Sequence, residues 1–221
     1  AVALAGVDVV SLGNNHSLDF GLDALADTQQ LLAAHGIGFM GAGSNERAAR
    51  APAIVERNGL RVAFLGYVDV APATWAAGPA SPGVAWADPT SIAADVTAAG
   101  TQADVVVVWL HTGVEGSDTV TGAQRELAHT AIDAGAALVL GAHPHVLQAM
   151  ERYNGGLIAY SLGNFVFDGF DFPENYSAIL AVTLTRSGVA AYDLIPVVVE
   201  DGLPRLASNG EAALILSQIP Q

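Results

Sequence analysis

Four side chains that could bind a metal ion each follow an apolar, strand-like segment of the chain. They are Asn15, after the run 7–12, His111, directly after the run 104–110, and His143 and His145, after the run 137–140. The carboxyl ends of parallel strands meet at one edge of an α/β sheet, so these side chains can converge on one cleft. Neutral imidazoles and a carboxamide oxygen from distant parts of a chain are typical ligands of a divalent metal ion. The sequence therefore predicts a metal site.

The histidine after Asn15 has an aspartate three residues further along the chain. A carboxylate at Asp19 can hold the His16 imidazole in one orientation, so that His16 can donate a proton in a reaction. A structural interpretation fits the same pattern, because Asn15 or Ser17 can cap a following helix that has Asp19 in its first turn. The two interpretations are compatible.

Less specific interpretations apply to several of these residues when each is taken alone. His111 could be a hydrogen-bonded histidine at the end of a strand, and the segment 143–145 could be a polar turn around its proline. Glu115 is either a carboxylate that orients an imidazole or an exposed surface acid. His35 and His129 lie in or beside helical patterns, and we expect them to be structural.

The composition excludes several kinds of chemistry. The chain has no lysine and no cysteine, so it lacks a phosphate-binding or Schiff-base lysine, a cysteine nucleophile and a thiolate metal site. No G-x-S-x-G nucleophile elbow is present, which argues against a serine hydrolase. The formal net charge of −14 argues against nucleic acid as a partner. No stretch reaches the roughly 18 uncharged apolar residues of a membrane helix.

Strand-like and helical apolar patterns alternate along the chain, which predicts an α/β architecture with a largely buried sheet. The predicted strands are 7–12, 54–57, 60–67, 105–110, 137–141, 156–160, 177–185 and 189–199, and the predicted helices end at Gly36, Gly100 and Gly135. Asn58-Gly59 predicts a two-residue hairpin, and Asp88-Pro89 predicts a helix start. Thr121 and Gln124 predict a capping box. Residues 69–89 are predicted to form a surface loop.

The length of 221 residues suits one large domain, and no repeat or linker divides it. We predict a single domain at 1–200 and a C-terminal edge segment or tail at 201–221. The chain begins without methionine and directly in a strand-like run, so we expect residues upstream of Ala1 to be missing.

Three motifs together resemble those of the capsule-synthesis CapA family, which belongs to the calcineurin-like metallophosphoesterase superfamily and is associated with poly-γ-glutamate capsule production. The resemblance covers most of residues 5–185. The motifs are Asn14-Asn15-His16-Ser17-Leu18-Asp19-Phe20-Gly21, His143-Pro144-His145-Val146-Leu147-Gln148 and Tyr160-Ser161-Leu162-Gly163-Asn164-Phe165-Val166-Phe167-Asp168.

The resemblance implies an α/β sandwich of two mixed sheets flanked by helices, a bacterial envelope or extracellular location, and divalent metal cofactors, either Zn, Mn or Fe. In that superfamily, two metals polarise phosphoryl oxygens and activate water. The implied site residues are Asn15, His111 and His143 as ligands of one metal, His145 as a ligand of its neighbour, and His16 with Asp19 as the proton-donor pair.

The sequence departs from the superfamily at its first motifs, which supply an aspartate and a bridging carboxylate to the metals. We see no acid at a matching strand end, which leaves four neutral ligands. Two neighbouring divalent cations repel each other strongly without anionic ligands. We therefore expect this segment to bind at most one metal tightly and to be a weak or inactive catalyst by itself.

Two functions remain open. The first is a metal-dependent hydrolase domain in poly-γ-glutamate capsule or cell-surface polymer biosynthesis, acting on a phosphoester or an amide-like link of an anionic polymer. The second is a noncatalytic metal-binding scaffold that joins partners in a capsule assembly or export complex. A net charge of −14 repels a polyglutamate substrate unless metals or clustered arginines reverse the local field.

Overall fold

The computed structural model of the chain describes residues 2–168 and 171–220, and its centre is a six-stranded sheet. The strands, in the order in which they lie, are β4 (Ala53–Arg57), β5 (Leu60–Val68), β7 (Val105–His111), β8 (Leu138–Ala142), β10 (Gly156–Ala159) and β9 (Met150–Tyr153). β5, β7, β8 and β10 are parallel, whereas the edge strands β4 and β9 are antiparallel to their neighbours. The sheet is therefore mixed.

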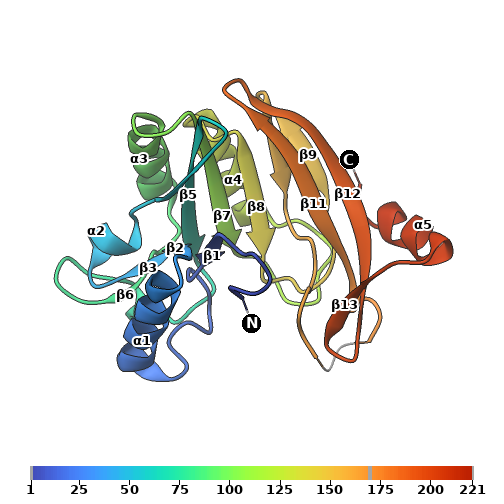
Figure 1. The fold of residues 1–221 in the computed structure, drawn as a ribbon, viewed down its shortest axis with the longest axis horizontal. Helices are drawn as coiled ribbons and strands as arrows, with labels where there is room; N and C mark the ends of the chain where they lie inside the picture. The colour runs from blue at the N-terminus through green and yellow to red at the C-terminus, as the bar shows by residue number, and fades with distance from the viewer. Residues whose placement is uncertain (1, 169–170, 221) are drawn as a thin grey trace.

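Different layers cover the two faces of this sheet (Figure 1). The helices α3 (Pro89–Gly100) and α4 (Gly122–Asp133) pack on one face, and an antiparallel sheet packs on the other. That second sheet consists of β11 (Tyr176–Thr185), β12 (Gly188–Glu200) and β13 (Leu203–Leu206), and α5 (Asn209–Ser217) follows it. The predicted α/β sandwich is confirmed, but its second sheet is antiparallel and not mixed as predicted.

The remaining elements lie beside β5. They are the parallel pair β1 (Val9–Ser11) and β2 (Gly38–Met40), the antiparallel pair β3 (Ala42–Gly43) and β6 (Gly83–Val84), the helices α1 (Gly21–Ala34) and α2 (Glu46–Ala49), and the short 3₁₀ helix η1 (Ala73–Trp75). Among the described residues, no helix combines the length and apolar character that crossing a membrane requires.

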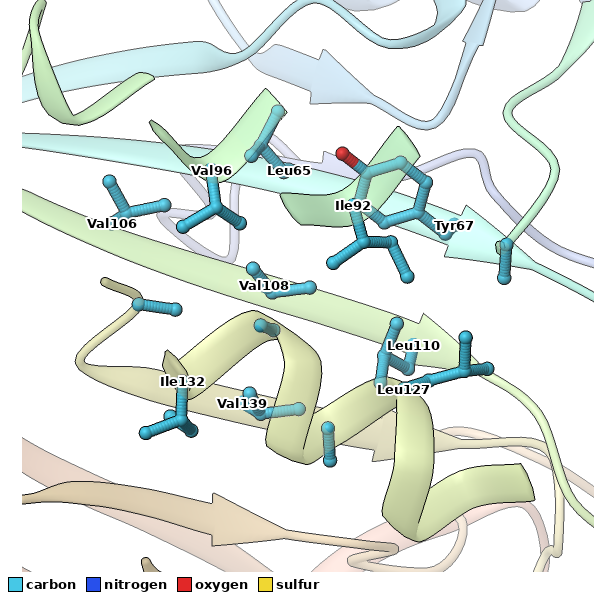
Figure 2. Close-up of a cluster of buried hydrophobic side chains, with 14 of the residues drawn as sticks. Leu65, Tyr67, Ile92, Val96, Val106, Val108, Leu110, Leu127, Ile132 and Val139 are labelled. Carbon is cyan, nitrogen blue, oxygen red and sulfur yellow. The ribbon is translucent and has the colours of Figure 1, made fainter. Parts of the chain in front are cut away.

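The central strand β7 is buried on both faces because its side chains alternate between two cores. Val106, Val108 and Leu110 pack against α3 and α4, as Figure 2 shows. Val105 and Val107 point the other way, into the core that is shared with β11, β12 and α5. A strand covered on both sides reads as a continuous β-branched run, and the prediction of a central strand here is confirmed.

Three local signals are confirmed where the sequence places them. Asn58 and Gly59 have φ values of 51° and 73° in the turn between β4 and β5, as a type I′ hairpin requires. The Asp88 side chain accepts a hydrogen bond from the Ser91 N–H at 2.9 Å at the start of α3. Thr121 forms a reciprocal capping box at the start of α4.

The sequence patterns miss the shorter elements. The predicted loop at 69–89 contains η1 and β6, and β2 and β9 have only three and four residues, which is too few for a period to be visible. In the segment 201–221, β13 pairs with the edge of β12, and Ile215 of α5 is buried in the core between the sheets. Leu214 and Leu216 of the same helix are exposed, so α5 is apolar on several sides and lacks an amphipathic pattern.

Gly141 in β8 lies very close to Tyr160, the residue that follows β10, and a substitution there tests this packing. A Cβ at this position would overlap the carbonyl oxygen of Tyr160, so Gly141→Ala must separate these segments. We expect it to lower the free energy of unfolding by about 1–3 kcal/mol, measured by urea titration.

The control is Gly100→Ala at the last position of α3, where a Cβ meets no neighbouring atom within 4 Å. Alanine is favoured in a helix by up to about 1 kcal/mol over glycine, so this variant should be as stable as the original protein or more so. Equal stability of the two variants would contradict the close packing at Gly141.

Candidate metal centre

Three neighbouring parallel strands end in register at one edge of the six-stranded sheet. The last residue of β5, His111 of β7 and Ala142 of β8 are paired across the sheet. The following residues continue this arrangement, because the Asp69 N–H donates to the His111 carbonyl at 3.4 Å and the Thr112 N–H donates to the Ala142 carbonyl at 3.0 Å. The sheet edge thus brings His111 close to His143, although 32 residues separate them in the sequence.

The four residues predicted as ligands lie together. The rings of His111 and His143 have centroids 5.0 Å apart, and those of His143 and His145 lie 6.2 Å apart. Asn15, in the turn between β1 and α1, places its Oδ1 atom 2.8 Å from His111 Nε2. The three histidines line a cleft of about 500 Å³.

The turn that carries two of these histidines has an unusual backbone. His143 and His145 have φ values of 101° and 64°, in a region of backbone conformation that residues other than glycine seldom adopt. Residues held in such conformations are concentrated at functional sites. The chain bends at residues 143–146, and both imidazoles line the same cleft.

Asn164 orients His145. Its Oδ1 atom lies 2.7 Å from His145 Nδ1, and because a carboxamide oxygen only accepts, Nδ1 carries the proton and donates it. The other ring nitrogen, Nε2, then presents a lone pair, as metal-binding histidines commonly do. The third sequence motif contains Asn164, but no pattern in the sequence assigns it a position in the site.

His16 and Asp19 form the expected pair outside the buried group. His16 Nδ1 lies 2.8 Å from Asp19 Oδ2, and His16 Nε2 lies 3.3 Å from Asn15 Nδ2. The His16 side chain is 64% exposed, so a substrate can reach it. The capping alternative is wrong, because Phe20 precedes α1 without a side-chain capping bond and the Ser17 hydroxyl donates to a backbone carbonyl instead.

Two acids lie near the histidines, in addition to the four neutral residues expected from the sequence. Asp69 directly follows β5, and its carboxylate is hydrogen-bonded to the Thr112 side chain. Glu115 Oε1 lies 3.9 Å from His143 Nδ1, and one ligand atom from each of Glu115, His143 and His145 lies within 4.8 Å of the others. Glu115 is 61% exposed, yet it lies close enough to contribute to the site.

Burial keeps the central imidazoles in the form that binds metals. It lowers the pKa of His111 from 6.5 to about 3 and also lowers the pKa of His143. His143 Nδ1 is buried without a hydrogen-bond partner. Ligating imidazoles must be unprotonated, so both rings are available to a cation at neutral pH.

The donor set fits a divalent cation. Two ligands about 2.0–2.2 Å from one ion and at right angles lie roughly 3 Å apart, and the separation between Asn15 Oδ1 and His111 Nε2 is 2.8 Å. Imidazole nitrogens with amide and carboxylate oxygens suit zinc, manganese and iron.

The two remaining histidines lie elsewhere. His35 Nδ1 is 2.8 Å from the Leu31 carbonyl oxygen at the end of α1. His129 in α4 stacks on Tyr153 with ring centroids 3.6 Å apart and lies 3.1 Å from Glu151.

Comparison with known proteins places this chain in a family. The family described as "Bacterial capsule synthesis protein PGA_cap" matches residues 1–169. The chain belongs to this family of bacterial capsule synthesis proteins. The family match includes every predicted site residue, from Asn15 to His145.

Two relatives within the capsule group share about a third of their aligned residues with the chain. The PGA biosynthesis protein CapA of Bacillus subtilis (strain 168) is 36% identical over 197 residues, which make up 89% of this chain and 52% of that protein. The capsule biosynthesis protein CapA of Bacillus anthracis is 35% identical over 209 residues, or 93% of this chain and 51% of that protein. The chain thus spans about half the length of these relatives.

A solved structure extends the comparison to the fold alone. A 5′-nucleotidase precursor from Thermus thermophilus has a TM-score of 0.56 and 17% identity, with coverage of 95% of this chain and 42% of that one. The chain therefore has the metallophosphoesterase fold.

The buried His111 predicts a pH dependence of stability in the metal-free protein. Its pKa in the folded chain lies below that in the unfolded chain, so on acidification the unfolded chain takes up a proton first. The contribution of neutral His111 to the free energy of unfolding is complete above pH 6.5. It is lost as the pH falls from 6.5 toward about 3, by about 1.4 kcal/mol per pH unit. Urea titrations in EDTA at about pH 7 and about pH 5.5 measure how far the free energy of unfolding falls between the two pH values. This decrease should be smaller for His111→Gln than for the original protein. The same pH effect in both proteins would contradict this role of burial.

Proposed function

We propose that the chain is a metal-dependent phosphoester hydrolase domain that serves the biosynthesis of poly-γ-glutamate capsule or a related cell-surface polymer in the bacterial envelope. The observation that carries the proposal is the contact of Asn15 with both His111 and His16. This one carboxamide joins the buried imidazole group to an exposed histidine–aspartate pair. Membership in the capsule family supports the process, and the metallophosphoesterase fold supports the reaction class.

The residues of the metal centre form two groups, one for each of two neighbouring cation positions. Asn15, His111 and His143 would hold one cation, and His145 with Glu115 would hold or approach a neighbouring one. A bound divalent cation supplies Lewis-acid polarisation of the phosphoryl oxygens and activation of water.

His16 is suited to protonate the leaving oxygen. Its Nδ1–H donates to Asp19 at 2.8 Å, which fixes the ring plane, and its neutral Nε2 accepts from the Asn15 amide at 3.3 Å. When His16 takes up a second proton, Nε2 becomes a donor and can no longer accept from that amide. The new N–H then needs an acceptor, and the departing oxygen of a substrate in the cleft supplies one.

The charge distribution favours an anionic substrate only when a cation is bound. The chain has a net charge of −14, and the described residues that line the cleft include no arginine. Positive potential therefore has to come from the metal, which the buried imidazoles can hold without cancelling its charge. This arrangement fits a phosphoester or the end of an anionic polymer.

Replacement of His16 by alanine separates this function from a noncatalytic scaffold in a capsule assembly complex. With Mn²⁺ and an alkyl phosphodiester such as glycerophosphocholine, whose leaving alkoxide needs a proton, His16→Ala should lower kcat by about 10²–10⁴-fold, the usual contribution of a general acid. Mn²⁺ affinity, measured by isothermal titration calorimetry, should stay close to that of the original protein because His16 lies outside the buried group.

The matched control is His35→Ala, which removes an exposed histidine at the end of α1. It should leave both turnover and metal affinity unchanged. Metal binding without any hydrolysis of phosphoesters or amides would support the scaffold and contradict the hydrolase, whereas equal turnover of the His16→Ala and original proteins would contradict the proton-donor role of His16.

A further inference from the structure

Unsatisfied polar atoms in the described part of the chain are few and are concentrated at the metal centre. Among these residues, three buried side-chain polar atoms lack a hydrogen-bond partner: Asp69 Oδ1, His143 Nδ1 and Asn175 Oδ1. Two of the three follow β5 and β8, the strands that lie on either side of β7. A buried acceptor without a partner is destabilising, so a pair of such atoms beside one site needs a functional reason.

The sheet itself fixes the position of Asp69. It is the first residue after β5, and its N–H donates to the carbonyl of His111 at 3.4 Å. One side of its carboxylate is hydrogen-bonded to Thr112, the residue that connects His111 to the next turn. Thr112 is only 3% exposed and its N–H is bonded to the end of β8, so the carboxylate is held on a rigid support.

Asp69 and Glu115 act on the same imidazole. Both carboxylates interact electrostatically with His143 and raise its pKa, against the larger effect of burial, which lowers it. Burial raises the pKa of Asp69, whereas the Thr112 hydrogen bond and the electrostatic interaction with His143 lower it. A divalent cation next to His143 would stabilise the Asp69 carboxylate more strongly than a neutral ring does.

Asp69 is better suited to support a ligand than to be one. The group of donor atoms within 4.8 Å of one another consists of Glu115, His143 and His145, and Asp69 lies outside it. Carboxylates behind metal-binding histidines orient the ring and make its ligating nitrogen more basic.

We propose that Asp69 is a positioning residue of the metal centre, whose buried carboxylate at the end of β5 places negative charge close to His143 and favours a cation bound there. This inference rests on the metal centre of the proposed function. It assigns to that centre an anionic group from the chain's own sheet, at a strand end where the sequence alone suggested none.

The test is Mn²⁺ affinity of the Asp69→Asn protein, measured by isothermal titration calorimetry at constant pH. Asparagine keeps the shape and the Thr112 contact but removes the charge, so the Kd for Mn²⁺ should rise by about 10- to 100-fold. Asp193→Asn is the matched control, since it makes the same change in net charge at an exposed position on β12, and its Kd should not change. The melting temperature without metal should be similar in all three proteins.

A second variant, Thr112→Val, keeps the carboxylate and removes the hydroxyl that holds it. It should weaken Mn²⁺ binding less than Asp69→Asn does, and it tests the inference if Asp69→Asn fails to fold. An unchanged Kd in either folded variant, with a His143→Ala protein that does lose binding, would overturn the role of Asp69 and leave the proposed metal centre intact. No Mn²⁺ binding by the original protein would overturn both proposals.

Discussion

The in-register ends of β5, β7 and β8 are the constraint on which the candidate site depends. Parallel strands whose last residues are paired deliver their next residues to one edge, so Asp69, Thr112 and His143 meet there together with His111. A slip of one residue in any of these strands would turn its side chains to the opposite face of the sheet. The tight packing on both faces of β7 resists such a slip, because each face fills a different core. The two cores therefore stabilise the fold and set the geometry of the cleft.

Burial divides the histidines by chemical task. His111 and His143 are covered, which keeps their imidazoles neutral and suited to a cation. His16 is largely exposed and is held by one carboxylate, as a group that exchanges protons with a substrate should be. Asn15 lies between the two kinds of histidine and contacts one of each. A cation bound by the buried imidazoles would thus lie deeper in the protein than His16, the residue proposed to donate the proton.

Much of the fold follows from local sequence signals that act over a few residues. Asn58-Gly59 and the capping box at Thr121 succeed because turns and helix ends depend on the chemistry of their own residues. The convergence of the histidines follows from a general property of parallel sheets. Asp69 is different. It follows an apolar run as His111 does, but its position beside His111 depends on the pairing of β5 with β7, which no short segment of the sequence encodes. The same limit applies to Asn164, whose contact with His145 spans 19 residues.

Anomalous X-ray diffraction from crystals of this chain grown with Mn²⁺ tests the central claim most directly, because it locates the cation independently of activity. We expect an anomalous peak in the cleft, about 2.0–2.2 Å from His111 Nε2 and Asn15 Oδ1, with the ring of His143 directed toward it. A structure in which Mn²⁺ binds elsewhere, and Asn15 and His111 keep their direct hydrogen bond in its presence, would contradict the proposed metal centre.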